Sequence, residues 1–286
     1  MWLLKSSVGR KVVMSLTGLF LILFVTFHVL MNAVALISPA GYNAVCAFLG
    51  ANWYALVGTL ILAAGALIHI IYAFWLTIQN RKARGNDRYQ VSSRPKNVEW
   101  ASQNMLVLGI IIVCFFVIHL IQFWSRMQLV EIMGNHAWVA PDGSQVLATD
   151  GAAFLYYAFK DWWTLVVYLI GFVALWFHMT HGFWSAFQTL GANNNIWMNR
   201  WKVIGNIWAT VVCLLFAVEA IAFTAMSNCD DCKNALLNAN QTECAVACEK
   251  AEAACEEVCE DAKEECKAAC EDVKEACAAA CEEAHK

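Results

Sequence analysis

The sequence contains five apolar stretches, each long enough to cross a lipid bilayer as a helix, which takes about 20 residues. Overall, 60% of the residues are apolar and only 15% are charged, whereas soluble domains carry about a quarter charged residues. This pattern predicts an all-α integral membrane protein with five transmembrane helices. We expect them at 12–37, 53–78, 105–124, 162–187 and 204–226.

The charges divide the chain into two predicted parts. Residues 1–226 carry 13 Lys and Arg against 7 Asp and Glu, a balance of +6. Residues 227–286 carry 6 against 16, a balance of −10, and the two sum to the net charge of −4. We therefore predict a membrane domain at 1–226 and a separate acidic tail at 227–286.

The basic residues predict the orientation of the membrane domain. They gather before the first stretch, between the second and third, and between the fourth and fifth. Lys and Arg favour the cytoplasmic side, so we expect a cytoplasmic N-terminus. An odd number of spans then places the tail on the outer, periplasmic side of the inner (cytoplasmic) membrane.

Four successive predicted helices each carry histidine, at His28, His69, His119 and His178, with His181 also on the fourth. A single intramembrane histidine commonly makes an interhelical hydrogen bond. A series of them is typical of function, because polar groups in hydrocarbon are costly. Since imidazole is a common axial ligand of haem iron, this arrangement predicts a four-helix bundle that binds haem.

The rise of about 1.5 Å per helical residue sorts the histidines by depth. His28 and His119 lie about 26 and 30 Å from the cytoplasmic edge, and His69 and His178 about 18 and 20 Å. We therefore predict two bis-histidine haems, an outer one on His28 and His119 and an inner one on His69 and His178. Depth does not separate His178 from His181, which stays an alternative ligand.

Two segments resemble the di-haem cytochrome b membrane-anchor subunit of succinate dehydrogenase/fumarate reductase. The first is SSVGRK at 6–11, followed by MSLTGLF at 14–20 and His28. The second is HMTHGFWSAFQTLG at 178–191. The resemblance covers the membrane domain, and implies that the histidine four residues before Gly182 is the ligand, which favours His178. It also implies the pairing of first with third helix and second with fourth.

The resemblance implies two b-type haems that pass electrons between an iron–sulfur subunit and quinone. A flavoprotein subunit, which carries out the succinate chemistry, and the iron–sulfur subunit would bind on the cytoplasmic side. In that family the quinone is commonly menaquinone. The expected partners are these subunits, quinone and the lipid bilayer, with no nucleic acid.

Three polar side chains lie near the predicted depth of the outer haem. Asn32 and Gln122 follow their histidines by one turn on the same helix face, so they are candidates for a quinone carbonyl. They are equally candidates for interhelical hydrogen bonds. Glu219 is the acidic residue well inside a predicted span, and an intramembrane carboxyl is a functional candidate. We predict that Glu219 transfers protons to or from quinone.

Basic side chains near the cytoplasmic edge are candidates for the haem propionates. Arg10 and Lys11 precede the first apolar stretch, and Arg81 and Arg88 follow the second. Basic residues there also serve to set topology, so this role competes with the simpler one.

The tail contains ten of the 13 cysteines, eight of them as i,i+4 pairs that repeat every 11 residues from Cys244 to Cys281. Eleven residues is almost three helical turns, which predicts a Cys-rich helix with a thiol face. This face could pack as a small apolar surface, form disulfides with another helix in an oxidising compartment, or bind metal through thiolates.

The predicted function is therefore membrane anchoring and electron transfer in a succinate:quinone oxidoreductase. Two alternatives remain: the cytochrome b subunit of another quinone-linked membrane oxidoreductase, and a non-redox membrane scaffold or transporter with structural histidines.

Overall fold

The computed structural model describes residues 6–84, 99–230, 232–239 and 275–277. Five of its helices are long and apolar enough to cross a membrane. They are α2 (Ser7–Ile37), α4 (Trp53–Arg84), α5 (Trp100–His119) with its continuation η1 (Leu120–Trp124), α8 (Trp162–Thr189) and α9 (Trp197–Ser227). The prediction of a multi-pass helical membrane protein is confirmed, and each helix covers the stretch expected from the sequence.

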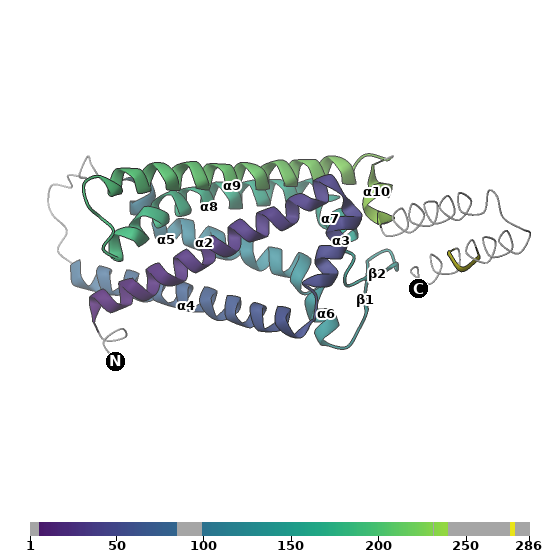
Figure 1. Cartoon of the computed structure of the whole chain (residues 1–286), viewed down its shortest axis with the longest axis horizontal. Helices are drawn as coiled ribbons and strands as arrows, with labels where there is room; N and C mark the ends of the chain where they lie inside the picture. The colour runs from purple at the N-terminus through teal and green to yellow at the C-terminus, as the bar shows by residue number, and fades with distance from the viewer. Residues whose placement is uncertain (1–5, 85–98, 231, 240–274, 278–286) are drawn as a thin grey trace, which may run out of the picture.

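The five long helices run along one axis, with α2 crossing the bundle obliquely (Figure 1). Helix α8 packs against α9, α5 and α2, and α2 also packs against α4. The principal core lies between α2, α8 and α9 and contains Val29, Phe172, Met179, Phe216 and Phe223. Helix α4 lies at the periphery, since none of its most apolar window is buried. The outward faces carry exposed Leu, Ile, Val, Phe and Trp side chains, as lipid-facing helices do.

Short elements cover one end of the bundle, which we call the capped end (Figure 1). These are α3 (Pro39–Phe48), α6 (Gln128–Ile132), β1 (Ala137–Val139), β2 (Gln145–Leu147), α7 (Gly151–Phe159) and α10 (Lys233–Leu237). The two strands form an antiparallel hairpin. Helix α7 packs on α3, α9 and α10, so segments from four parts of the sequence meet at this end.

Polar side chains cap the N-termini of α3 and α7 and link the two helices. The hydroxyl of Ser38 accepts a hydrogen bond from the Gly41 amide at 3.0 Å and starts α3. The carboxylate of Asp150 caps α7 by accepting from the Ala153 amide at 3.1 Å. The side chain of Asn43, in α3, donates to Asp150 at 2.8 Å. The capped end is therefore held by hydrogen bonds that satisfy the free amides of helix N-termini.

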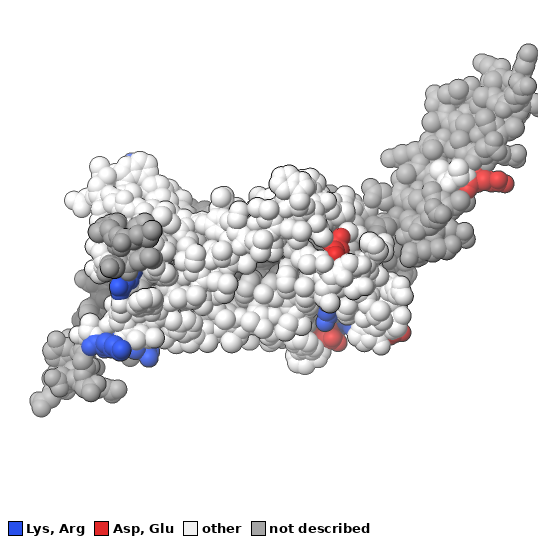
Figure 2. Space-filling view, turned by 90° about the horizontal axis from the view of Figure 1, so that it is seen from below, with Lys and Arg blue, Asp and Glu red and all other residues white. Residues whose placement is uncertain are grey.

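Described basic residues gather at the opposite end, which we call the basic end. Figure 2 shows a group of Lys and Arg at this end of one face, and toward the other end most of the visible Asp and Glu beside a further group of Lys and Arg. The basic residues at this end include Arg10, Lys11, Arg81, Lys82, Arg200 and Lys202. The cytoplasmic location of this end stays a prediction.

The Cys-rich helix expected in the tail lies almost wholly outside the described residues. Of residues 227–286, the described part comprises the end of α9, α10 and the short helical piece 275–277. Leu236 of α10 is fully buried in a cluster with Ala152 of α7. This contact ties the first residues of the tail to the capped end of the bundle.

Candidate functional site

The structure brings His28 and His119 together near the capped end. His28 lies on α2 and His119 is the last residue of α5, and their ring centroids are 5.7 Å apart with the planes at 87°. His119 is followed directly by the π-helical turn η1. Such turns are rare and are frequent at functional sites.

His69 and His178 form a second pair nearer the basic end. His69 lies on α4 and His178 on α8, with ring centroids 6.3 Å apart and the planes at 64°. Gly18 of α2 makes room for this pair, because a Cβ atom there would lie 3.3 Å from Cε1 of His69. The pairs thus join first helix with third and second with fourth.

Both separations fit two imidazoles on one metal ion. An imidazole nitrogen binds a metal at about 2.0 Å, so two axial rings have centroids about 6 Å apart. No cluster of three or more His, Cys, Asp or Glu is arranged for a metal among the described residues. A metal held by either pair would need further ligands, which a porphyrin supplies.

One histidine of each pair has a hydroxyl oxygen within hydrogen-bond distance of its Nδ1. Thr17 donates its hydroxyl proton to the Val13 carbonyl at 2.9 Å, so its oxygen can accept from Nδ1 of His69 at 3.1 Å. Tyr168 donates to Gln122 at 2.9 Å and can accept from Nδ1 of His119 at 3.2 Å. With the proton on Nδ1, Nε2 keeps the lone pair that a metal needs.

The other two histidines lie in more apolar surroundings. His28 stacks on Phe24, with ring centroids 5.4 Å apart and an angle of 19°. Nδ1 of His178 is buried with no hydrogen-bond partner among the described residues. A buried polar atom without a partner costs about 1–3 kcal/mol, so Nδ1 of His178 is an unsatisfied atom at this pair.

His181 is directed away from these pairs. Its Nδ1 lies 3.2 Å from a carboxylate oxygen of Glu99, just before α5, and Lys202 pairs with the same carboxylate at 3.4 Å. In the structure His178, and not His181, is the residue of α8 whose ring faces His69.

Polar side chains next to the pair His28–His119 form a group that we call the capped-end polar cluster. It comprises Asn32, Tyr42, Gln122, Thr164, Tyr168 and Glu219. Asn32 accepts a hydrogen bond from the Tyr42 hydroxyl at 2.9 Å. Gln122, besides accepting from Tyr168, has its amide 3.5 Å from Thr164. Both amides therefore bond across elements, as one of the two sequence interpretations expected.

Glu219 lies within the same cluster and is 3% exposed. One of its carboxyl oxygens has no hydrogen-bond partner among the described residues. Burial raises the pKa of Tyr42 well above its ordinary value, and the charges of neighbouring Cys46, Glu219 and Tyr168 raise it further. Glu219 is thus a buried carboxyl with one unpartnered oxygen among the described residues, and its role in proton transfer stays a prediction.

Sequence reasoning missed Tyr42, Thr164 and Tyr168. A signal existed for Tyr168, because a tyrosine inside a predicted span needs a partner for its hydroxyl. Tyr42 lies in α3, a short element that the sequence pattern did not predict, and Thr164 lies in the first turn of α8.

The basic candidates for haem propionates lie at the basic end. The guanidinium of Arg10 lies 5.1 Å from the ring centroid of Trp75 on α4, the helix that carries His69. Lys11 and Arg81 are exposed, and Arg88 lies outside the described residues. Their role toward propionates stays a prediction.

Comparison of the chain with protein-family models, curated proteins and solved structures finds no match. The residues and their geometry therefore carry the functional argument.

Proposed function

We propose that this chain is a di-haem cytochrome b membrane anchor of a succinate:quinone oxidoreductase. The observation that carries the proposal is the presence of two histidine pairs, at two depths, on four different helices. Each pair has a ring separation that fits two imidazoles bound to one metal ion. The resemblance of residues 6–28 and 178–191 to the succinate dehydrogenase/fumarate reductase anchor supports the choice of complex.

In this proposal His28 and His119 hold one b-type haem, and His69 and His178 hold the other. Haem iron would supply one-electron transfer between a donor at the basic end and quinone. The residues of the chain bind and orient the haems. Thr17 and Tyr168 each fix the imidazole of one histidine ligand, one in each pair. Arg10 and Lys11 are placed at the end where propionates of the second haem would need cations.

The partners follow from the same proposal. A flavoprotein and an iron–sulfur subunit bind at the basic, cytoplasmic end, and quinone, with menaquinone as the expected type, is reduced or oxidised near the capped-end polar cluster. Glu219 exchanges protons with that quinone. The capped end and the tail then face the periplasm.

A reduced-minus-oxidised spectrum of the purified full chain tests the haem assignment. We expect a b-type signal, and a chain that binds no haem when it is produced with an adequate haem supply would refute the proposal. Co-purification with flavin and iron–sulfur subunits, and reduction of the haems by succinate, would separate this complex from other quinone-linked oxidoreductases.

Replacing Glu219 with Gln tests the proton-transfer role, because Gln keeps the shape of Glu but does not titrate. We expect slower quinone turnover and a changed pH dependence, with haem content unchanged. Turnover and pH dependence equal to those of the wild type would remove Glu219 from the mechanism.

A further inference from the structure

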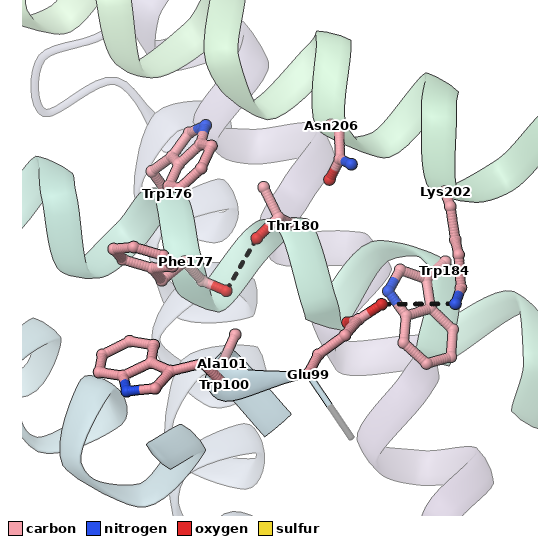
Figure 3. A pocket seen from close by; sticks show the side chains of 9 residues that line it. All are labelled: Glu99, Trp100, Ala101, Trp176, Phe177, Thr180, Trp184, Lys202 and Asn206. Carbon is pink, nitrogen blue, oxygen red and sulfur yellow. Dashed lines mark hydrogen bonds and ion pairs between the residues drawn. The ribbon is translucent and has the colours of Figure 1, made fainter. Parts of the chain in front are cut away.

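A pocket of about 300 Å³ lies at the basic end, between the start of α5 and the helices α8 and α9 (Figure 3). Its lining combines a carboxylate, an ammonium group, an amide and several aromatic rings. Helices α5 and α9 are both long and apolar enough to span a membrane, and the pocket lies where these two helices begin. We therefore expect it at the level where a bilayer changes from headgroups to hydrocarbon.

Two opposite charges lie side by side in this pocket (Figure 3). Nζ of Lys202 is 3.4 Å from one carboxylate oxygen of Glu99, and Nδ1 of His181 is 3.2 Å from the other. Burial raises the pKa of Glu99, but hydrogen bonds from His181 and Lys202 outweigh it and hold that pKa below its ordinary value, so the carboxylate is ionised. The side chains of Lys202 and Glu99 are still 40% and 44% exposed. Since an ammonium group has three donors and a carboxylate several acceptor positions, each has capacity for a second partner.

The pair favours a ligand that itself carries both charges. An anion would meet Glu99 as well as Lys202, and a cation would meet Lys202 as well as Glu99, so one member of the pair would repel either ligand. A zwitterion with its ammonium at Glu99 and its phosphate at Lys202 would be attracted by both. The ethanolamine headgroup of a phospholipid has this form, with its two charges joined by a short ethylene link. Its primary ammonium donates charge-assisted hydrogen bonds to a carboxylate, which a quaternary ammonium does not.

The amide of Asn206 supplies a further polar partner. It hangs from α9 toward Thr180 (Figure 3), is exposed and makes no hydrogen bond with the described residues. Asn206 lies one turn beyond Lys202, inside the segment that is apolar enough to span a membrane, where a polar side chain facing lipid is costly. An ester carbonyl, which lies just below the phosphate in a phospholipid, would accept a hydrogen bond from this amide.

Apolar side chains complete the pocket and extend beyond it. Phe177 contacts Trp100 and Trp176, with ring centroids 4.9 and 4.7 Å apart. Further along the spans, Val107 on α5 and Ile207 on α9 are exposed. Indole rings favour the membrane interface, and exposed aliphatic side chains within a span face acyl chains. A lipid with its headgroup in the pocket can therefore place its acyl chains along this surface.

We propose that this pocket binds the headgroup of one phosphatidylethanolamine molecule. The lipid ammonium donates to the carboxylate of Glu99, the phosphate accepts from Nζ of Lys202, and an ester carbonyl accepts from the amide of Asn206. The acyl chains leave past Trp100 toward Val107, so the lipid ties the start of α5 to α9. The inference needs the membrane location of these helices and not the haem assignment, so its test is separate from that of the proposed function.

Native mass spectrometry of the full chain, delipidated in detergent and titrated with one lipid at a time, tests this site. We expect phosphatidylethanolamine to bind more tightly than phosphatidylcholine, which lacks ammonium donors, and more tightly than phosphatidylglycerol, which lacks the cation. Soluble glycerophosphoethanolamine should not compete at the concentration of the lipid, because it has no acyl chains to bury. A photoreactive phosphatidylethanolamine in nanodiscs should label peptides of α5 and α9 that flank the pocket.

Two variants test the polar contacts separately. Asn206→Leu should weaken binding of phosphatidylethanolamine about tenfold, the effect of losing one hydrogen bond to a bound ligand, and it breaks no hydrogen bond among the described residues. Glu99→Gln should reverse the preference from phosphatidylethanolamine to phosphatidylglycerol, because the charge of Lys202 is then unbalanced. Asp161→Asn removes an exposed carboxylate just before α8, at the capped end; as the matched control it should leave the lipid preference unchanged.

Several outcomes would overturn the inference. They are equal affinity of the wild type for phosphatidylethanolamine and phosphatidylcholine, a wild-type preference for phosphatidylglycerol, wild-type affinity in Asn206→Leu, and an unchanged preference in Glu99→Gln. Competition by glycerophosphoethanolamine at the concentration of the lipid would also overturn it, since the ligand would then be a soluble headgroup compound.

Discussion

The two histidine pairs have the same composition but different surroundings. At the capped end, His119 is held by Tyr168, which in turn donates to the buried Gln122. Nearer the basic end, His69 meets one hydroxyl, that of Thr17, and Nδ1 of His178 has no partner among the described residues. One pair is therefore positioned by a chain of hydrogen bonds, and the other mainly by packing.

This difference teaches how a bundle can orient ligands at two depths. A chain of side-chain hydrogen bonds fixes ring rotation and raises ligand basicity, but each member becomes costly to remove. The position of a ring that packs against Gly18 depends instead on the space that its neighbours leave. We expect haem binding at the His28–His119 pair to be most sensitive to the loss of a polar group. At the His69–His178 pair we expect it to be most sensitive to added side-chain volume.

The largest expected effect comes from removing a ligand. His178→Leu should reduce haem content from two per chain to one, because the haem proposed for the basic-end pair would lose one of its two histidines. His181→Leu, three residues further on the same helix, is the matched control and should keep both haems. Haem loss in His181→Leu with retention in His178→Leu would reverse the assignment.

Tyr168→Phe should have the next largest effect. It leaves the Gln122 oxygen buried without a donor, which costs about 1–3 kcal/mol of stability. It also removes the acceptor for Nδ1 of His119, so the ligand becomes less basic. The midpoint potential of the proposed haem should then rise by on the order of 60 mV, which corresponds to a tenfold change in a one-electron equilibrium.

Thr17→Val is the counterpart at the other pair. It should raise the potential of the basic-end haem similarly but cost less stability, since the Thr17 hydroxyl donates only to backbone carbonyls of its own helix. Redox titration and thermal unfolding measure both quantities. Equal losses of stability in Tyr168→Phe and Thr17→Val would break the comparison.

Gly18→Ala probes the packing at the basic-end pair. The added Cβ would lie 3.3 Å from Cε1 of His69, so the ring must shift, at a cost of about 1 kcal/mol. Haem titration should show weaker binding at this pair alone. Gly58→Ala on α4 is the control, because its Cβ would meet nothing within 4 Å; equal haem affinity in both variants would argue against control by packing.

The smallest effect is expected at the cap, away from both pairs. Burial raises the pKa of Asp150 above 3.8, although hydrogen bonds from Ala153 and Asn43 lower it in part. A carboxyl group with a raised pKa stabilises the folded protein at pH values below its pKa in the unfolded chain. This contribution is lost as the pH rises through its pKa in the folded protein.

Asp150→Asn keeps the cap and removes the charge. The free energy of unfolding of this variant should not show the decline that the wild type shows as the pH rises through the acidic range. Near neutral pH the variant should therefore be more stable than the wild type. A variant that is less stable than the wild type at neutral pH would show that the carboxylate itself holds the cap.

The five spans were predictable because about 20 apolar residues in succession leave few alternatives. The observed helices extend further at their polar ends: α2 begins at Ser7 where the prediction began at residue 12, and α9 at Trp197 where it began at 204. Apolar content marks the hydrocarbon core, whereas helix ends are set by caps such as Ser6, which accepts from the Gly9 amide at 2.9 Å.

Depth arithmetic anticipated which histidines lie together, because helical rise is the same in every span. Ring orientation and hydrogen bonding were not predictable. They depend on helix rotation and on contacts such as that of Tyr168 with His119, 49 residues away. Elements α3, α7 and the β-hairpin escaped prediction because their short segments are stabilised by one another.

The haem-to-polypeptide ratio of the purified full chain, measured as the pyridine haemochrome, tests the central claim most directly. We predict two b haems per chain, with electron paramagnetic resonance signals of two bis-histidine sites. A ratio of zero, or two haems retained when either His28 or His69 is replaced by Leu, would contradict the account of two independent pairs.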